Sequence, residues 1–261
     1  GREEMKSLIV SPDNFLANLP FAVLLEPHNG SRKALLDRRV ISYIPSATVY
    51  RTLVAVPVLE QPPRILAVGN ANYPPGVCPL PFAEREAVMV SELFEDSVLL
   101  VGADATEERI ASLAPAYNIL HFATHGVSLE NFAPGASSLL MTTANGRDGF
   151  LSASEVAAMD LSHVYVATLS ACQTASISAS GASGLGSLST AFLIAGVPSV
   201  IGSLWQVHDA ATTDVMLGFY ARYLRTGTAA AMRAAMQATR VQPEFADPYY
   251  WAGFVVYGWN K

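Results

Sequence analysis

The segment that decides the fold runs from His163 to Ala175 and reads His-Val-Tyr-Val-Ala-Thr-Leu-Ser-Ala-Cys-Gln-Thr-Ala. Residues 164–169 form a nearly continuous apolar run, which is typical of a strand buried on both faces of a parallel sheet. Small polar residues end this run, and Cys172 lies among them. Reactive groups of open α/β sheets lie just beyond the carboxyl ends of the strands. Cys172 therefore occupies a position where a nucleophile is expected.

A second buried-strand run shows the same arrangement. Residues 117–122 read Tyr-Asn-Ile-Leu-His-Phe, and they are followed by Ala123, Thr124, His125 and Gly126. If the two strands are neighbours in one parallel sheet, His125 and Cys172 emerge at the same edge, roughly 5 Å apart. A thiolate can then attack a carbonyl while the imidazole protonates the leaving group. Each residue alone has a plainer interpretation, as an inert buried cysteine or a histidine in a turn.

The composition excludes several classes of protein. Of the 261 residues, 51% are apolar and 15% are charged, which predicts a folded body with a well-filled core. A net charge of −6 and the lack of a dense Lys/Arg run argue against direct binding of nucleic acid. Two cysteines, Cys78 and Cys172, are too few for a disulfide framework or a CxxC zinc site, so a cytoplasmic location is expected. The longest apolar-leaning run, residues 191–205, is too short to predict a membrane span, and no membrane partner is expected.

The order of the expected elements predicts the domain organisation. Residues 1–60 are expected to form a small accessory lobe built on short strands, and the proline-containing segment 54–63 is the expected linker. Residues 61–261 are expected to form the catalytic lobe, because strands alternate there with helices. This alternation predicts a mostly parallel sheet with helices on both faces. The opening Gly1-Arg2-Glu3-Glu4 indicates a piece of a longer protein.

Two blocks resemble the signature of a known family. The blocks at 121–126 (His-Phe-Ala-Thr-His-Gly) and 169–175 (Leu-Ser-Ala-Cys-Gln-Thr-Ala) resemble those of the CHAT domain, which groups with caspases and separases among the cysteine proteases. Five further blocks follow the family's order: Leu19-Pro20-Phe21, Ile44-Pro45-Ser46, Asp148-Gly149-Phe150-Leu151, Gly202-Ser203-Leu204-Trp205-Gln206-Val207-His208-Asp209 and Pro248-Tyr249-Tyr250-Trp251-Ala252.

The resemblance implies a fold and a set of site residues. The fold is a caspase-like α/β sandwich, with residues 1–60 as a pseudo-caspase-like accessory lobe of one CHAT domain. His125 and Cys172 form the catalytic dyad, and the backbone N–H groups of Gly126 and Cys172 form the oxyanion hole. No metal or organic cofactor is expected. Because a cysteine is partly ionised near neutral pH, two residues suffice without a third group to orient the base.

The residues that bind the substrate are predicted less sharply. The related separase block reads Leu-Trp-Asp-Val-Thr-Asp, and an acid there is associated with a basic side chain just before the cut. In this sequence the two acids correspond to Gln206 and Asp209. Asp209 is predicted either to line a pocket for Arg or Lys or to serve as the N-cap of the helix expected over 210–224. The neutral Gln206 weakens the inference of strict basic specificity.

Two other histidines, a serine hydrolase elbow and a nucleotide-binding loop are the alternatives to this interpretation. His121 lies within its strand and is expected to pack or hydrogen-bond in the core. His208 follows Cys172 in the order of papain-like enzymes, but no papain-like block surrounds Cys172. The sequence contains no Gly-x-Ser-x-Gly elbow of a serine hydrolase. The run Gly184-Leu185-Gly186 does not directly follow a strand, as a nucleotide-binding loop would.

The sequence thus predicts a cysteine endopeptidase that cleaves a protein partner. The resemblance implies control by an N-terminal helical-repeat region or a regulatory protein, since CHAT domains commonly follow such repeats. One alternative is a catalytically silent scaffold that uses the same fold to bind a partner. Another keeps the dyad but transfers the acyl group to an acceptor other than water.

Overall fold

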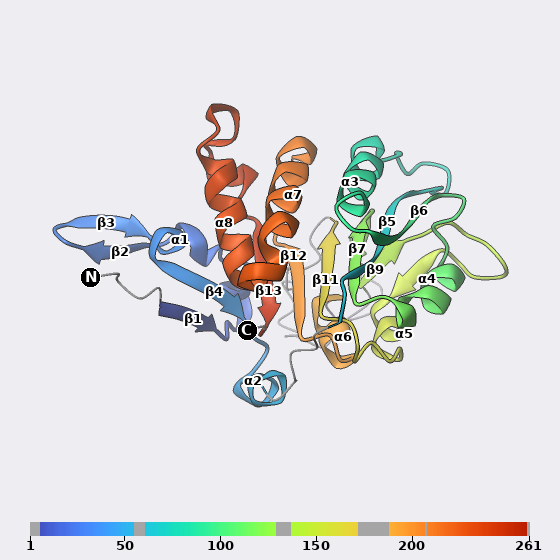
Figure 1. Ribbon diagram of the computed structural model, residues 1–261, viewed down its shortest axis with the longest axis horizontal. Helices are drawn as coiled ribbons and strands as arrows, with labels where there is room; N and C mark the ends of the chain where they lie inside the picture. Colours follow the sequence, from blue (N-terminus) through green and yellow to red (C-terminus); the bar gives the residue numbers. More distant parts are fainter. Residues whose placement is uncertain (1–5, 55–60, 129–136, 172–187, 207, 260–261) are drawn as a thin grey trace.

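The computed structural model describes residues 6–54, 61–128, 137–171, 188–206 and 208–259. Within these ranges the chain forms one large sheet flanked by helices (Figure 1). The eight strands of the sheet lie side by side in the order β1 (Lys6–Val10), β4 (Arg39–Tyr43), β13 (Phe254–Gly258), β12 (Ser199–Ser203), β11 (Val166–Ser170), β7 (Ile119–Ala123), β5 (Arg64–Ala71) and β6 (Asp96–Gly102).

The sheet is mostly parallel, as the sequence predicts. Every neighbouring pair is parallel except β12 with β13. Strands β1 and β4 join this same sheet through β13, where Tyr257 lies opposite Tyr43. The expected lobe boundary near residue 60 adjoins residues 55–60, which lie outside the described ranges. The division of the chain into two lobes therefore stays a prediction.

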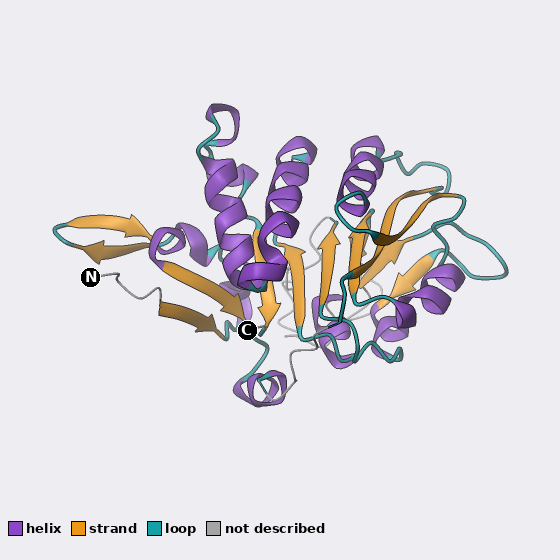
Figure 2. Cartoon of the chain, viewed as in Figure 1, coloured by secondary structure: helices purple, strands orange, loops and turns teal. Residues whose placement is uncertain are grey.

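Helices cover the sheet on both faces (Figure 2). In chain order they are α1 (Leu35–Arg38), α2 (Ala47–Leu53), α3 (Pro81–Ser91), α4 (Glu107–Leu113), α5 (Ala153–Ala157), α6 (Leu188–Ile194), α7 (Asp209–Thr226) and α8 (Thr228–Arg240). Short 3-10 helices occupy Asn14–Asn18, Phe21–Val23, Ala114–Ala116, Pro243–Phe245 and Pro248–Tyr250. No helix in the described ranges combines the length and the apolar character needed to cross a membrane.

The central strands are mostly apolar because each contributes to two cores. Ile119 of β7 packs with α3, α7 and α8, whereas its neighbour Leu120 packs on the opposite face with α4, α5 and α6. Ile65 and Leu66 of β5 divide between the two cores in the same way. Successive side chains of a strand point to opposite faces, so burial on both faces produces a continuous apolar run.

Three helices begin at a side chain that caps them. The hydroxyl of Ser46 accepts a hydrogen bond from the backbone N–H of Val49 at the start of α2. Thr106 caps α4 in the same manner, and Ser152 forms a full capping box with Glu155 at α5. Such side chains satisfy backbone N–H groups that have no partner within the helix.

The structure also contains two smaller antiparallel sheets. A three-stranded sheet consists of β8 (Gly126–Ser128), β9 (Ser137–Leu140) and β10 (Phe150–Ser152). A protruding hairpin consists of β2 (Leu25–His28) and β3 (Ser31–Ala34). The 3-10 helix Phe21–Val23 precedes this hairpin, whose first strand starts at Leu25. The turn between β2 and β3 is formed by Asn29 and Gly30, both with positive φ, which suits a tight hairpin.

Candidate active site

The site lies where β7 and β11 end side by side. Their register pairs Ser170 with Ala123, so that the chain leaves the two strands at the same level. The Ser203 hydroxyl at the end of β12 donates a 2.6 Å hydrogen bond to the carbonyl oxygen of Ala171 and ties a third strand end to this edge. Cys172 comes next and lies outside the described residues. Its contact with His125, and its N–H in the oxyanion hole, therefore stay predictions.

His125 is held by a backbone carbonyl. It lies between β7 and β8, and its Nε2 lies 2.8 Å from the carbonyl oxygen of Cys78. A carbonyl oxygen can only accept, so Nε2 carries a proton, and Nδ1 is the nitrogen that can take up or release another. The Tyr73 ring packs edge-on against the imidazole, with a centroid distance of 4.7 Å. The Cys78 carbonyl is thus a third group that orients the base, which sequence reasoning did not anticipate.

A buried hydroxyl pair fixes the ring that packs on His125. Thr124 Oγ1 donates to the Leu140 carbonyl oxygen at 2.7 Å, and the Tyr73 hydroxyl lies 2.9 Å from the same Oγ1. Burial raises the pKa of the Tyr73 phenol, which keeps it protonated near neutral pH. Since Thr124 uses its own proton on Leu140, Tyr73 is the donor of the shared bond. The position of the Tyr73 ring is therefore set by β7 and β9.

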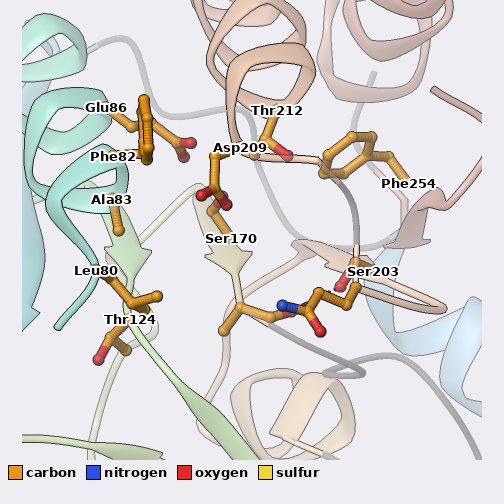
Figure 3. Close-up of a pocket in the computed structure, with 12 residues that line it drawn as sticks. Leu80, Phe82, Ala83, Glu86, Thr124, Ser170, Ser203, Asp209, Thr212 and Phe254 are labelled. Atoms are coloured by element: carbon orange, nitrogen blue, oxygen red, sulfur yellow. Dashed lines mark hydrogen bonds between the residues drawn. The ribbon is translucent and has the colours of Figure 1, made fainter. Parts of the chain in front are cut away.

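A cavity of about 60 Å³ opens beside these strand ends (Figure 3). Its polar lining comes from α3, from the ends of three strands and from α7: Glu86, Thr124, Ser170, Ser203, Gln206, Asp209 and Thr212. Asp209 and Gln206, which the sequence singled out, are thus brought together with the edge that precedes Cys172. In Figure 3 the carboxylates of Asp209 and Glu86 both point into the space between α3 and α7.

Asp209 is the first residue of α7 and does not cap it. His208 occupies the N-cap position, and no side chain makes a cap hydrogen bond there. The expectation that Asp209 serves as the N-cap is therefore wrong. In the first turn its negative charge is still stabilised by the helix dipole. Its exposed carboxylate is available to a ligand in the cavity.

The two competing histidines lie elsewhere. His121 is fully buried in β7, with Nδ1 3.2 Å from the Tyr220 hydroxyl, which confirms that it belongs to the core. His208 packs against the rings of Phe245 and Tyr250, and it is not among the described residues that line the cavity. In the part of the chain that the structure describes, no three His, Cys, Asp or Glu side chains gather as they would around a metal ion.

Several residues of the site were missed by sequence reasoning. The Cys78 carbonyl gave no signal, because a backbone oxygen has no identity in the sequence. Glu86 did leave one: it lies on the same face of α3 as Ala87 and Val90, which are buried. A charged residue on an apolar helix face calls for a partner or a role.

The comparisons with known proteins identify the family of the chain. The family model of the CHAT domain matches residues 1–259. The chain belongs to the CHAT domain family. Among curated proteins it is similar to human tetratricopeptide repeat protein 28, with 29% identity over 304 residues, and to the mouse protein of the same name, with 28% identity over 310 residues. Each alignment covers 99% of this chain but 12% of the relative, so this chain corresponds to a small part of those proteins.

Solved structures of the same fold include two proteases. Separase in the Saccharomyces cerevisiae separase–securin complex matches with a TM-score of 0.63 and 15% identity, over 97% of this chain and 15% of that chain. The Arg-specific cysteine proteinase gingipain R matches with a TM-score of 0.59 and 12% identity, over 85% of this chain and 54% of that chain. These likenesses confirm the predicted caspase-like fold of the CHAT domain.

We expect Thr124→Val to lower the free energy of unfolding by about 1–3 kcal/mol, because it removes the hydrogen bonds of Thr124 Oγ1 with the Leu140 carbonyl and with the Tyr73 hydroxyl. Tyr73→Phe is the matched control: it removes one hydroxyl and leaves the bond from Thr124 to Leu140, so its cost is about 1 kcal/mol. Urea denaturation of both variants measures the difference. Equal losses would contradict the hydrogen-bond order described above.

Proposed function

We propose that this CHAT domain is a cysteine endopeptidase that cleaves a protein partner, with Cys172 as nucleophile and His125 as acid and base. The single observation that carries the proposal is the position of His125. It follows β7, the direct parallel neighbour of β11, and a backbone carbonyl fixes which of its ring nitrogens is protonated. Membership in the family and the fold shared with cysteine proteases support the same chemistry.

In the proposed reaction the Cys172 thiolate attacks the scissile carbonyl carbon. The backbone N–H groups of Gly126 and Cys172 stabilise the oxyanion, each contributing on the order of 3 kcal/mol. His125 protonates the leaving amine, and a thioester remains on Cys172. Water, deprotonated by His125, then hydrolyses the thioester and regenerates the thiolate. The bond from Nε2–H to the Cys78 carbonyl stabilises the imidazolium that forms when His125 accepts a proton.

We infer that the residue before the cut is basic. The carboxylate of Asp209 lines the same cavity as Ser170 and Ala171, the two residues that precede the proposed nucleophile. Gingipain R, which shares the fold, is an Arg-specific enzyme by name. Gln206 contributes a neutral amide to the same cavity, so Asp209 supplies the charge on that wall.

We also propose that a helical-repeat region or a regulatory protein controls the cleavage. The curated relatives are repeat proteins by name and are far longer than this chain, and the separase of similar fold was solved in complex with securin. Such a partner would act on access to the strand ends that bear the dyad.

The dyad is tested by labelling with a peptidyl chloromethyl ketone and by incubation with proteins encoded beside this one. We expect labelling at Cys172 and a discrete product fragment, both absent in Cys172→Ala. His125→Ala should slow cleavage by roughly 10²–10⁴-fold, the usual contribution of general acid–base catalysis. Cys78→Ser is the control and should retain activity, because only the backbone carbonyl of Cys78 contacts His125. A wild-type protein that is neither labelled nor active would favour the silent scaffold.

Asp209→Asn should reduce kcat/KM about tenfold or more for peptides with Arg or Lys before the cut, because a bound cation loses a charge partner from which it has excluded water. Peptides with a neutral residue there should be unaffected. Asp214→Asn is the matched control on the same helix, since Asp214 accepts a hydrogen bond from Gln242 and does not line the cavity. Steady-state kinetics on both variants decides; equal effects on basic and neutral peptides would contradict the proposed pocket.

Control by a partner is tested by comparing initial rates of this chain alone and of the longer protein that contains it, on the same substrate and with Cys172→Ala as background. We expect the rates to differ, because the partner region changes access to the strand ends. Identical rates with and without the additional region would refute the regulatory proposal.

A further inference from the structure

Glu86 is a buried carboxylate that the proposed reaction does not use. It lies on α3, is 3% exposed and lines the same cavity as Asp209. Its Oε1 makes no hydrogen bond to any described residue and lies 3.2 Å from His121 Nε2, with which it forms an ion pair only when that ring is protonated. Burying a carboxylate without such bonds is costly, and an unsatisfied buried group therefore calls for an explanation.

The carboxylate is held in place from behind. His121 is fully buried between Glu86 and Tyr220, and the Tyr220 hydroxyl lies 2.8 Å from Thr168 Oγ1 in β11. Burial raises the pKa of Tyr220, so this phenol stays neutral and can donate. The chain of contacts therefore runs from the cavity through β7 and α7 to β11. Glu86 is thus backed by fixed elements of the core and directed toward the cavity (Figure 3).

The cavity has the charge and the size for a cationic group. Of the described residues that line it, Glu86 and Asp209 are acidic and none is Lys or Arg. By the same measure a water molecule needs about 10–15 Å³, so a cavity of about 60 Å³ has room for the several heavy atoms of a side-chain head group. Apolar walls, which include Leu80 and Phe254, can pack against the aliphatic stem of such a side chain.

We propose that Glu86 is a second specificity-determining residue. Together with Asp209 it binds the positive charge of the side chain before the cut. The proposal rests on the proposed function for the identity of that side chain. The two carboxylates come from different helices, α3 and α7, so a cation between them contacts a buried wall and an exposed rim.

The test uses the full chain and ligands that need no cleavage: the N-acetyl amides of arginine, lysine and citrulline, titrated by NMR. Citrulline has nearly the shape of arginine without the charge. We expect wild type to bind the arginine and lysine probes more tightly than the citrulline probe. Glu86→Gln should weaken binding of both cations at least about tenfold and leave citrulline unchanged. Glu92→Gln, an exposed change of equal charge at the C-cap of α3, should alter nothing.

The outcomes separate this inference from the proposed function. Unchanged binding of the cationic probes by Glu86→Gln overturns the inference, and so does a parallel loss for all three probes, which would indicate a structural role. Should Glu86→Gln fail to fold, Glu86→Asp keeps the charge and should still prefer the cations to citrulline. Charge-dependent binding through Glu86 in a protein that no chloromethyl ketone labels would support the cavity's role and refute the peptidase.

Discussion

The pairing of β7 with β11 is the constraint on which the site depends. Ile119 lies opposite Val166 in the core beneath α3, α7 and α8, and the next pair, Leu120 and Ala167, faces the core on the other side. A shift of one residue would exchange the two faces of a strand that is buried on both, so the register is strongly fixed. Hydrophobic packing therefore determines that both strands end at one level. The position of the polar edge beyond the two strands is therefore determined by the packing of the core.

The same packing places the acidic groups of the cavity. Gly69 of β5 allows α3 to lie unusually close, since a Cβ there would stand 2.7 Å from the Cβ of Ala87. Glu86 precedes Ala87 and is thereby held near the strand ends. On the other wall, Tyr220 anchors α7 through its hydrogen bond with His121 and its edge-on contact with the Phe94 ring. The charges belong to helices that cannot move without disturbing the core.

The local sequence predicts much of this arrangement, whereas the remainder depends on long-range contacts. Apolar runs predict β7 and β11, and Ser46, Thr106 and Ser152 are residue types that favour a helix start, because each signal lies within a few residues of its element. The antiparallel place of β13 beside β12 depends on pairing between segments more than fifty residues apart. The contact of the Cys78 carbonyl with His125 spans 47 positions and involves a backbone atom, which any residue would supply.

The rim of the cavity shows how two distant family blocks serve one site. Trp205 Nε1 donates to the carbonyl oxygen of Tyr249, and the Tyr249 hydroxyl donates to that of Gln206, at 3.0 Å each. The acceptor of each bond is a backbone oxygen, so this contact tolerates a change of side chain at position 206. The neutral Gln206 therefore need not distort the cavity. Compared with the Asp of the separase block, it removes one negative charge. The negative charge then resides on Asp209 and Glu86, whose positions are set by helices. The charge recognition that we propose is thereby tied to the core and not to the loop.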